Sequence, residues 1–419
     1  DERRDERRDD RRGGGSAPRH APAVPDRKKR SPSGSPSSSG SGGGSGSDGG
    51  SDEDEIIHFD WKPDAMLNGR YRLLKLLGDG TFGRCVLAED RHTGSQVAIK
   101  VIRDVKRYME NAKIEADILK DIARKDPRGS SGCAVMFDTF THWDRFYCLV
   151  FEPLGVSLYD FLKNNHFRGF WMQDLQQFAK QSMQALAFLH GDCRLTHTDL
   201  KPENILLHSM APAQPCDFPR RDEWVRRRRA SSEPWQDPGP YLRPASSRIK
   251  LIDFGNATYA DEHHSSIINT RQYRGPEVLL SAGWDESSDQ WSIGCILMEL
   301  YSGEQLFETH EELEHLALIS RIIGELPEDM MAKASPSVRE RYLARDSRTG
   351  RWRLPWPEKA SSAASERHVA SQVRLKEQAL PHHQPFADFV ASLLRLEPSR
   401  RPSASRAQNH AFFEYNFVD

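Results

Sequence analysis

The feature that most constrains this 419-residue chain is a run of eight residues followed at once by an apolar strand. The run reads His197-Thr198-Asp199-Leu200-Lys201-Pro202-Glu203-Asn204, and Ile205-Leu206-Leu207 follows it. Asp199 can accept the proton of an attacking hydroxyl, Lys201 can neutralise charge on a transferring phosphate, and Asn204 can hold a metal ion. Chance assembly of the whole run in a solvated loop is rare. The sequence therefore predicts a phosphoryl-transfer site with these three residues as its catalytic groups.

A glycine-rich hairpin is predicted upstream of this run. It contains Gly78, Gly80 and Gly83 between the apolar runs 73–77 and 85–88. Glycine has no side chain that would block the approach of backbone N–H groups to phosphates. A third strand, Val97-Ala98-Ile99-Lys100, follows the hairpin, whereas a dinucleotide-binding fingerprint would run directly into a helix. We therefore expect Lys100 to bind the α- and β-phosphates of a nucleotide.

Two carboxylates complete the expected site. Glu115 lies in the predicted helix 105–122 and is the expected ion-pair partner of Lys100. Downstream, Ile249-Lys250-Leu251-Ile252 reads as a buried strand that ends in Asp253-Phe254-Gly255. Asp253 is the expected main metal ligand, and Phe254 packs in a way that can switch such a site on or off.

Two further pairings are predicted beyond this strand, where an activation segment is expected. Glu277, in Gly275-Pro276-Glu277, should form a buried ion pair with Arg401. Asp289 begins a very apolar helix, and its carboxylate should anchor the backbone of the catalytic loop. Because all these elements occur in the right order, a chance origin of the whole pattern is very improbable.

Taken together, these motifs resemble the protein kinases, and within them the LAMMER (CLK) family of dual-specificity kinases of the CMGC group. The segments that carry the resemblance are 197–207, Asp253-Phe254-Gly255-Asn256-Ala257, Thr270-Arg271-Gln272-Tyr273-Arg274 and 314–324. The family signature Leu-Ala-Met-Met-Glu-Arg stands here as Leu-Ala-Leu-Ile-Ser-Arg, so Ser320 replaces a carboxylate. Cys85 and Gly275 replace the usual Val and Ala, small changes in volume that should spare catalysis.

The resemblance, which covers roughly residues 61–417, implies an α+β, bilobal protein kinase fold. A small β-rich N-lobe is expected at 56–152 and a larger α-helical C-lobe at 153–417, with insertions at 208–247 and 325–385. Residues 1–55 are rich in charge, Ser and Gly, cannot bury a core and should be disordered. Loops as long as the two insertions are normally functional or disordered.

The resemblance also implies a binding site for ATP and Mg²⁺. The expected nucleotide ligands are Leu77, Gly78, Gly80, Gly83, Cys85, Ala98, Lys100, Glu115, Phe151, Glu152 and Leu154, and the expected metal ligands are Asn204 and Asp253. Phe151 should be a bulky gatekeeper at the end of a strand, and 152–154 should form the hinge that pairs with adenine. Because Pro153 has no N–H, we expect Leu154 to be the hinge donor.

The implied substrates are serines in Arg/Ser-rich splicing factors, with autophosphorylation on tyrosine. Acidic residues would dock the substrate arginines, and Glu203 and Asp160 are the candidates. The implied location is nuclear, with a cytoplasmic pool also allowed, and Arg27-Lys28-Lys29-Arg30 is a candidate nuclear-import patch. We expect a monomer.

Three alternatives stay open. An SR-protein kinase shares His-Thr-Asp at the catalytic loop and has similar substrates, although Phe254 and the run 291–295 favour the LAMMER family. A dual-specificity tyrosine-regulated kinase should carry Tyr-x-Tyr in its activation segment, where only Tyr273 lies nearby. A pseudokinase scaffold that binds splicing factors without catalysis is disfavoured, because the set of phosphate and metal ligands is intact.

Thr198 stands where many kinases carry an arginine that grips a phosphorylated activation segment. A threonine is uncharged and too short to grip a phosphate bidentately. The segment should therefore be ordered by its own contacts, through Arg271 or Arg274 and the packing of Ile267 and Ile268. We expect an enzyme that is active without phosphorylation there.

Composition limits the remaining possibilities. The net charge of −2 argues against bulk nucleic-acid binding. No apolar run approaches the roughly 18 residues of a membrane span, so no membrane partner is expected. The six cysteines show no paired spacing and should be reduced thiols of a cytosolic or nuclear protein.

Overall fold

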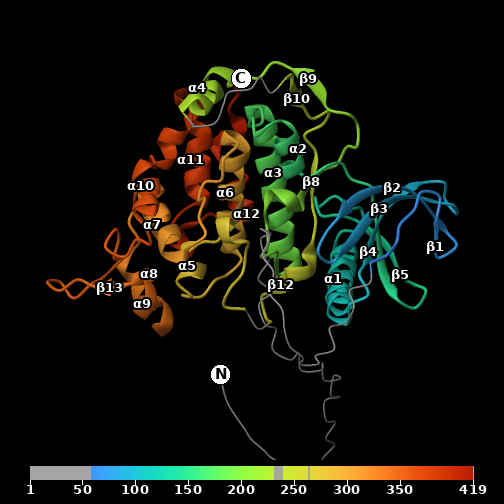
Figure 1. The fold of residues 1–419 in the computed structure, drawn as a ribbon, viewed down its shortest axis with the longest axis horizontal. Coiled ribbons are helices and arrows are strands. Elements are labelled where there is room, and N and C mark those ends of the chain that lie inside the picture. Colours follow the sequence, from blue (N-terminus) through green and yellow to red (C-terminus); the bar gives the residue numbers. More distant parts are fainter. Residues whose placement is uncertain (1–57, 231–238, 263–264, 419) are drawn as a thin grey trace, which may run out of the picture. The chain divides into compact units, whose positions relative to one another are not determined.

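The computed structural model describes residues 58–230, 239–262 and 265–418. The tail 1–55, with the patch Arg27–Arg30, lies outside the described residues. Figure 1 shows a strand-rich part at one side and a larger helical part at the other, which is the expected protein kinase architecture. None of the helices in the described ranges is long and apolar enough to cross a membrane. All six cysteines are free.

The strand-rich part is a six-stranded antiparallel sheet in the order β1-β2-β3-β4-β6-β5. Its strands are Met66–Leu67, Tyr71–Asp79, Gly83–Asp90, Gln96–Ile102, Met136–His142 (β5) and Phe146–Phe151 (β6). Alternate residues of β3 and β4, among them Val86 and Ile99, are fully buried on one face, as the two-residue period of a strand requires. Helix α1, Lys106–Lys125, packs Ala112, Ala116 and Leu119 into the main core at helical spacing.

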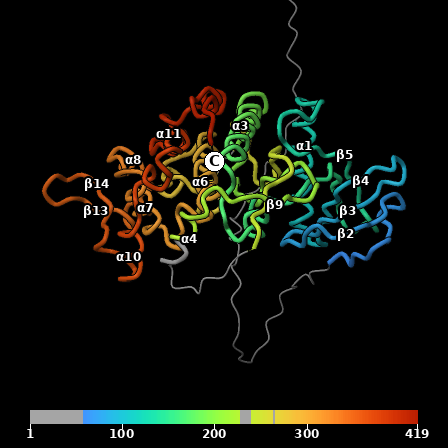
Figure 2. Tube along the Cα trace, turned by 90° about the horizontal axis from the view of Figure 1, so that it is seen from above, coloured from blue at the N-terminus to red at the C-terminus, as the bar shows by residue number. Residues whose placement is uncertain are grey.

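The helical part is built around α6, Ser287–Ser302, nearly all of which is buried. Its neighbours are α2 (Leu158–Asn164), α3 (Met172–Phe188), α5 (Pro276–Leu279), α7 (Glu312–Ile322), α11 (Gln384–Leu393) and α12 (Ala404–Ala407). Figure 2 shows α6 between α3 and α11. A helix that is apolar all round belongs in a core, so α6 provides a fixed base for the loops at its N-terminus.

Two short strand pairs frame the catalytic loop. Strand β7 (Leu195–Thr196) pairs with β12 (Thr258–Tyr259), and β8 (Ile205–Leu207) pairs with β11 (Ile249–Leu251). Both pairs are antiparallel. The loop 197–204 therefore runs from β7 to β8, and the segment that begins at Asp253 follows β11, the partner of β8.

The first insertion, expected as a long loop, is an ordered element in its described part. It contains β9 (Gln214–Cys216), α4 (Arg221–Ala230) and β10 (Tyr241–Arg243). The side chain of Asn165 donates to the carbonyl of Leu242 (2.8 Å) and accepts from its N–H (3.0 Å), as a paired strand would. Arg243 adds a two-bond ion pair to Asp174 at 2.8 and 3.1 Å. These contacts fix the insertion to the helical part.

The second insertion is also folded. It contains α8 (Glu328–Lys333), α9 (Pro336–Tyr342), β13 (Ala344–Arg345), β14 (Trp352–Arg353) and α10 (Ala363–Ser371). Strands β13 and β14 form a hairpin that projects from the edge of the molecule in Figures 1 and 2. Neither insertion is therefore a structureless loop over its described residues.

Candidate active site

The catalytic loop is held from below by one buried carboxylate. Asp289, at the start of α6, accepts from the backbone N–H of His197 (2.8 Å) and of Thr198 (3.0 Å). His190 lies 2.8 Å from the same carboxylate. Thr198 has a φ of 64°, a left-handed conformation that is costly for a β-branched residue. The two bonds from Asp289 stabilise this backbone, so the predicted anchoring by Asp289 is present.

The three catalytic residues predicted from the sequence lie together in this loop. Lys201 Nζ lies 2.8 Å from Asp199 Oδ2, and the Thr270 hydroxyl donates to Asp199 Oδ1 at 2.7 Å. The amide nitrogen of Asn204 donates to the carbonyl of Asp199 at 2.9 Å. The carboxylate of Asp199 is thus fixed from two sides, and the amide oxygen of Asn204 is left for another ligand. Thr270 was not predicted in this role, since its hydroxyl lies far from Asp199 in sequence.

The charged groups of the nucleotide cleft form a connected set. Lys100 Nζ lies 2.8 Å from Glu115 Oε2 and 3.6 Å from Asp253 Oδ1. Burial opposes the charged form of Lys100, but the carboxylates of Glu115 and Asp253 outweigh it and raise the pKa of Lys100 above its ordinary value. Burial likewise opposes the charge of Asp253, yet Lys100 keeps the pKa of Asp253 below its ordinary value. Both groups are therefore charged at neutral pH.

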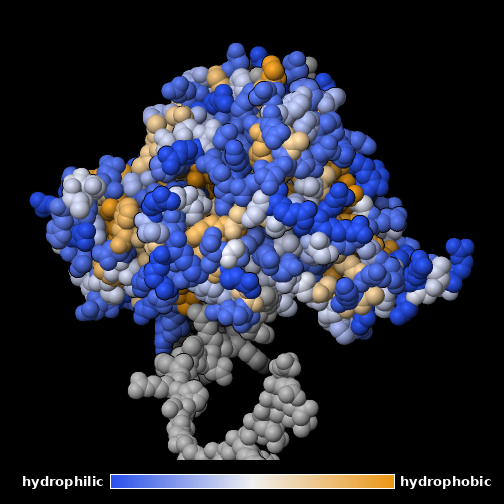
Figure 3. All heavy atoms as spheres, turned by 180° about the vertical axis from the view of Figure 1, so that it is seen from behind, coloured by the Kyte–Doolittle hydropathy of each residue, from blue (hydrophilic) through white to orange (hydrophobic). Residues whose placement is uncertain are grey.

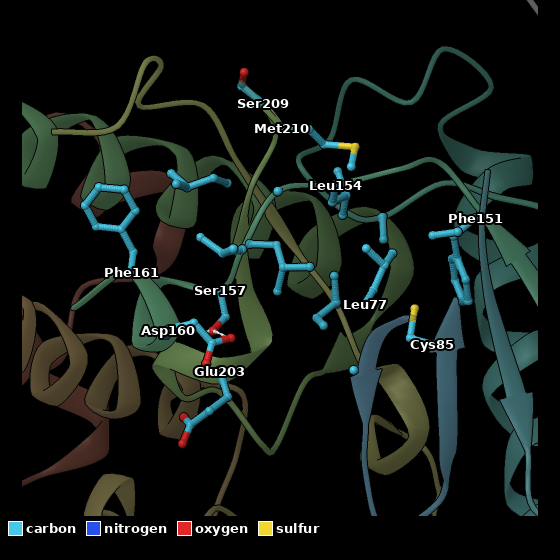
Figure 4. A pocket seen from close by; sticks show the side chains of 18 of the residues that line it. Leu77, Cys85, Phe151, Leu154, Ser157, Asp160, Phe161, Glu203, Ser209 and Met210 are labelled. Carbon is cyan, nitrogen blue, oxygen red and sulfur yellow. Dashed lines mark hydrogen bonds between the residues drawn. The ribbon is translucent and has the colours of Figure 1, made fainter. Parts of the chain in front are cut away.

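A cavity of about 890 Å³ lies between the two parts of the molecule. Every nucleotide ligand expected from the sequence lines it, and so does Asp253: Leu77, Gly78, Gly80, Gly83, Cys85, Ala98, Lys100, Glu115, Phe151, Glu152 and Leu154. Figure 4 shows Leu77, Cys85, Phe151 and Leu154 around this space. Asp199, Lys201 and Asn204 are not part of the cavity wall and lie in the adjoining loop. A volume of this size suits a nucleotide.

The glycine-rich hairpin closes over the cavity from β2 and β3. A side chain at Gly83 would collide with the backbone carbonyl of Val101, so the position requires glycine. Burial raises the pKa of the Cys85 thiol to about 11, and the neutral thiol therefore acts as a small apolar contact.

The segment 152–154, which was expected to form the hinge, directly follows β6. Phe151 is the last residue of β6, and the chain leaves the sheet at Glu152. Within the described residues the backbone N–H of Leu154 makes no hydrogen bond. The side chain of Glu152 is turned to Lys250 (3.1 Å) and to the N–H of Val135 (3.0 Å). The backbone N–H of Glu152 donates to the carbonyl of Val135 at 3.0 Å, so the group of Glu152 that can bind a ligand is its backbone carbonyl.

The first insertion contributes wall residues that sequence reasoning missed. They are Ser209, Met210, Ala211, Pro212, Ala213, Leu242, Pro244, Ala245 and Ser246. In Figure 4 Met210 lies beside Leu154 at the outer end of the hinge. No local motif marks these residues, because their place depends on the docking of the insertion through Asn165 and Arg243.

The activation segment is held by the expected arginines. Arg274 donates to the carbonyls of Ile268 and Asn269, both at 3.0 Å, and Arg271 lies 3.3 Å from Glu312. Ile268 is buried, but Ile267 is 48% exposed, so the expected packing of Ile267 was wrong. Neighbouring side chains of an extended segment point to opposite sides, and only one of the two can face the core.

Two buried contacts complete the segment. Tyr273 is 3% exposed, and its hydroxyl donates to Glu299 at 2.7 Å. Burial raises the pKa of Glu299 to about 7, and the charge of Glu203 adds to this. The predicted pair of Glu277 and Arg401 is present as two bonds of 2.7 Å.

Comparison with known proteins agrees with this geometry. Residues 71–413 match the protein kinase domain family. The serine/threonine-protein kinase AFC3 of Arabidopsis thaliana is 41% identical over 86% of this chain and 86% of its own length. The dual specificity protein kinase CLK2 of Homo sapiens is 39% identical over 84% of this chain and 65% of its own length.

A solved structure has the same fold. It is the crystal structure of a kinase domain, with a TM-score of 0.75 and 40% identity, and it covers 86% of this chain and all of its own. Because the kinase family model matches residues 71–413 and relatives named as AFC and CLK kinases are about 40% identical over most of the chain, the chain belongs to the protein kinase family, in its LAMMER (CLK and AFC) branch.

Proposed function

We propose that this protein is a dual-specificity kinase that transfers the γ-phosphate of ATP to serines of Arg/Ser-rich splicing factors, and to its own tyrosines. The observation that supports transfer to a hydroxyl is the carboxylate of Asp199, fixed by Lys201 and Thr270. A general base must be held within hydrogen-bond reach of the proton that it accepts. Asp199 takes that proton, and Lys201 balances charge on the phosphoryl group.

The residues around the cleft fit ATP and Mg²⁺. Asp253 offers a carboxylate and Asn204 an amide oxygen. Mg²⁺ prefers such oxygen ligands, and its remaining ligands are commonly waters and substrate phosphates. In the described ranges no cluster of three His, Cys, Asp or Glu side chains could hold a metal without a nucleotide. When bound, Mg²⁺ supplies neutralisation of phosphate charge. Lys100, fixed by Glu115, binds the α- and β-phosphates, and the N–H of Leu154 donates to adenine.

Recognition of arginine is assigned to acidic groups at the rim of the cleft. Asp160 and Glu203 both line the cavity, and Figure 4 shows them close together. Ser157 donates to Asp160 at 2.7 Å and so orients its carboxylate. Charge-assisted bonds from guanidinium groups to such carboxylates are strong. We further propose a monomer that works in the nucleus.

The test is an assay with radiolabelled ATP and an Arg/Ser peptide, with a Lys/Ser peptide of the same length as the substrate control. Asp199→Asn should lower turnover at least 100-fold, as loss of a positioned catalytic group does. Asp192→Asn, an exposed carboxylate near the loop, should have no effect. Wild-type turnover that does not distinguish the two peptides would contradict the substrate assignment. An active Asp199→Asn variant would contradict the role of Asp199.

A further inference from the structure

The end of α9 and the β13–β14 hairpin carry a concentrated positive charge. Six arginines lie between positions 339 and 353: Arg339, Arg341, Arg345, Arg348, Arg351 and Arg353. Only two carboxylates, Glu340 and Asp346, lie among them. This segment, which we name the arginine hairpin, is basic in a chain whose net charge is −2. It projects from the molecule in Figure 1, and the corresponding projection in Figure 3 is hydrophilic.

Most of this charge is not neutralised within the molecule. The carboxylate of Asp346 is used by its own turn, where it accepts from Thr349 N (2.7 Å) and Arg348 N (3.1 Å). Arg353 pairs with Glu358 at 2.9 Å. The exposed side chains of Arg341, Arg348 and Arg351 have no ion-pair partner among the described residues.

Aromatic stacking orders part of the arginine hairpin. The guanidinium of Arg345 lies 4.4 Å from the centre of the Trp352 ring, and that of Arg339 lies 5.7 Å from it. A stacked guanidinium keeps N–H groups at its edge for hydrogen bonding. Because stacking restricts these long side chains, less conformational entropy is lost when they bind an anion.

The arginine hairpin begins where the activation segment is anchored. The hydroxyl of Tyr342, the last residue of α9, donates to Glu312 at 3.4 Å. The same carboxylate lies 3.3 Å from Arg271, the residue after Thr270, whose hydroxyl contacts Asp199. One carboxylate therefore links the base of the arginine hairpin to the segment beside the catalytic base.

We propose that the arginine hairpin binds phosphoserines of an Arg/Ser-rich chain that the active site has already phosphorylated. The inference rests on the proposed function. A phosphoserine carries a charge of about −1.5 to −2 at pH 7, and arginine forks bind phosphate oxygens bidentately. Serines modified early would be held on the hairpin while a later serine of the same chain enters the active site.

A phosphoserine chain fits this surface better than a nucleic acid does. The basic surface is one short hairpin, whereas nucleic-acid affinity grows with the number of phosphates that a protein neutralises along its length. Clustered phosphoserines, by contrast, place several charges within a few residues.

The experiment uses the full chain and a fluorescein-labelled peptide of four Arg-Ser repeats, in unmodified and serine-phosphorylated forms. Dissociation constants are measured by fluorescence anisotropy for wild type and for Arg348→Gln/Arg351→Gln. The control, Arg91→Gln/Arg128→Gln, removes the same charge from exposed arginines elsewhere. Turnover of the unmodified peptide to its first phosphate is measured in parallel.

Wild type should bind the phosphorylated peptide more tightly than the unmodified one. The hairpin variant should lose about tenfold or more of this affinity, since charge-assisted bonds are lost, and the control should change less than twofold. First-phosphate turnover should be unchanged. Equal binding by wild type and the hairpin variant would overturn the proposal, as would tighter binding of poly(U) than of the phosphopeptide. Absence of turnover in wild type would instead contradict the proposed function.

Discussion

At the scale of single residues, Lys100 and Asp253 balance the charge of the nucleotide cleft. They lie 3.6 Å apart, and each holds the other in its charged form. The positions of both followed from short motifs, since each lies at the end of a short run that is rich in apolar residues. Their contact could not be read from spacing, because it depends on the packing of α1 against both β4 and the segment that follows Asp253.

Replacing Lys100 by Met or Asp253 by Ala should abolish phosphotransfer and leave the fold intact. Phosphoryl transfer depends on positioning and charge neutralisation, and one preorganised contact is typically worth a factor of about 100 or more in rate. Turnover of an Arg/Ser peptide and far-ultraviolet circular dichroism should be measured, with Lys180→Met, an exposed lysine, as the control. A folded variant within about tenfold of wild type would refute the assigned role.

The raised pKa of Glu299 leads us to expect that the stability of the folded protein depends on pH. The pKa of Glu299 is raised from 4.5 to about 7, so the folded protein keeps a proton that the unfolded protein releases in this interval. The free energy of unfolding should therefore fall as the pH rises through it. Replacing Glu299 by Gln removes this titrating group. The free energy of unfolding of the variant, relative to that of wild type, should be higher at pH 8 than at pH 5 by roughly 2 kcal/mol.

Urea unfolding at the two pH values measures this difference. Glu304→Gln, an exposed carboxylate of the same region, is the control and should show no such change. A relative stability of Glu299→Gln that does not vary with pH would show that Glu299 titrates at an ordinary pKa.

At the scale of elements, the activation segment is ordered by contacts that contain no phosphate. Arg274 and Arg271 bind backbone and carboxylate groups, and the Tyr273 hydroxyl is buried against Glu299. Thr198, where an arginine would grip a phosphate, instead donates its hydroxyl to the carbonyl of Asn256 at 2.7 Å. Tyr273 cannot be phosphorylated unless the segment first leaves the core.

Treatment with a phosphatase should therefore leave the activity nearly unchanged. Mass spectrometry would confirm that Ser265, Ser266, Thr270 and Tyr273 are unmodified. The turnover of an Arg/Ser peptide would then be measured. The segment keeps its order, because its partners are side chains of the same molecule. This expectation would be disproved if the phosphatase lowered turnover about 100-fold or more and rephosphorylation of the segment restored it.

Helices and strands could be predicted where apolar residues recur with a regular spacing over a long stretch. The ends of these elements and the structure of the insertions could not be predicted. Helix α7 ends at Ile322, and Ile323 beyond its end still packs against the core. A helix end depends on capping and on packing of the next residues, which one sequence does not show. The first insertion was expected to be a loop, because its strands β9 and β10 have only three residues each. Strand β10 is held by Asn165 and Asp174, which lie outside the insertion.

At the scale of the whole molecule, one ion pair joins distant parts of the chain. Glu277, at the end of the activation segment, and Arg401, near the C-terminal helices, are both almost completely buried and share two bonds. Arg401 also donates to the carbonyl of Arg395 at 2.8 Å. The pair was predictable from the motifs at its two ends.

Arg401→Met should lower the free energy of unfolding by about 3–5 kcal/mol, since it leaves a buried carboxylate without a partner. Urea unfolding would measure this. Arg400→Met is a matched control, because Arg400 is exposed and lies 3.7 Å from Glu397; it should cost less than about 1 kcal/mol. Equal losses in the two variants would mean that Glu277 is not left unpaired.

Within the first insertion, the pairing of Cys216 with Tyr241 brings together the two ends of the segment 217–240. The segment 217–240 therefore begins and ends at neighbouring positions. Residues can therefore be gained or lost near its tip without a change in the spacing between β8 and β11. A reporter domain inserted there would travel with the enzyme and leave its catalytic geometry untouched, and natural relatives are free to differ in length at this place for the same reason.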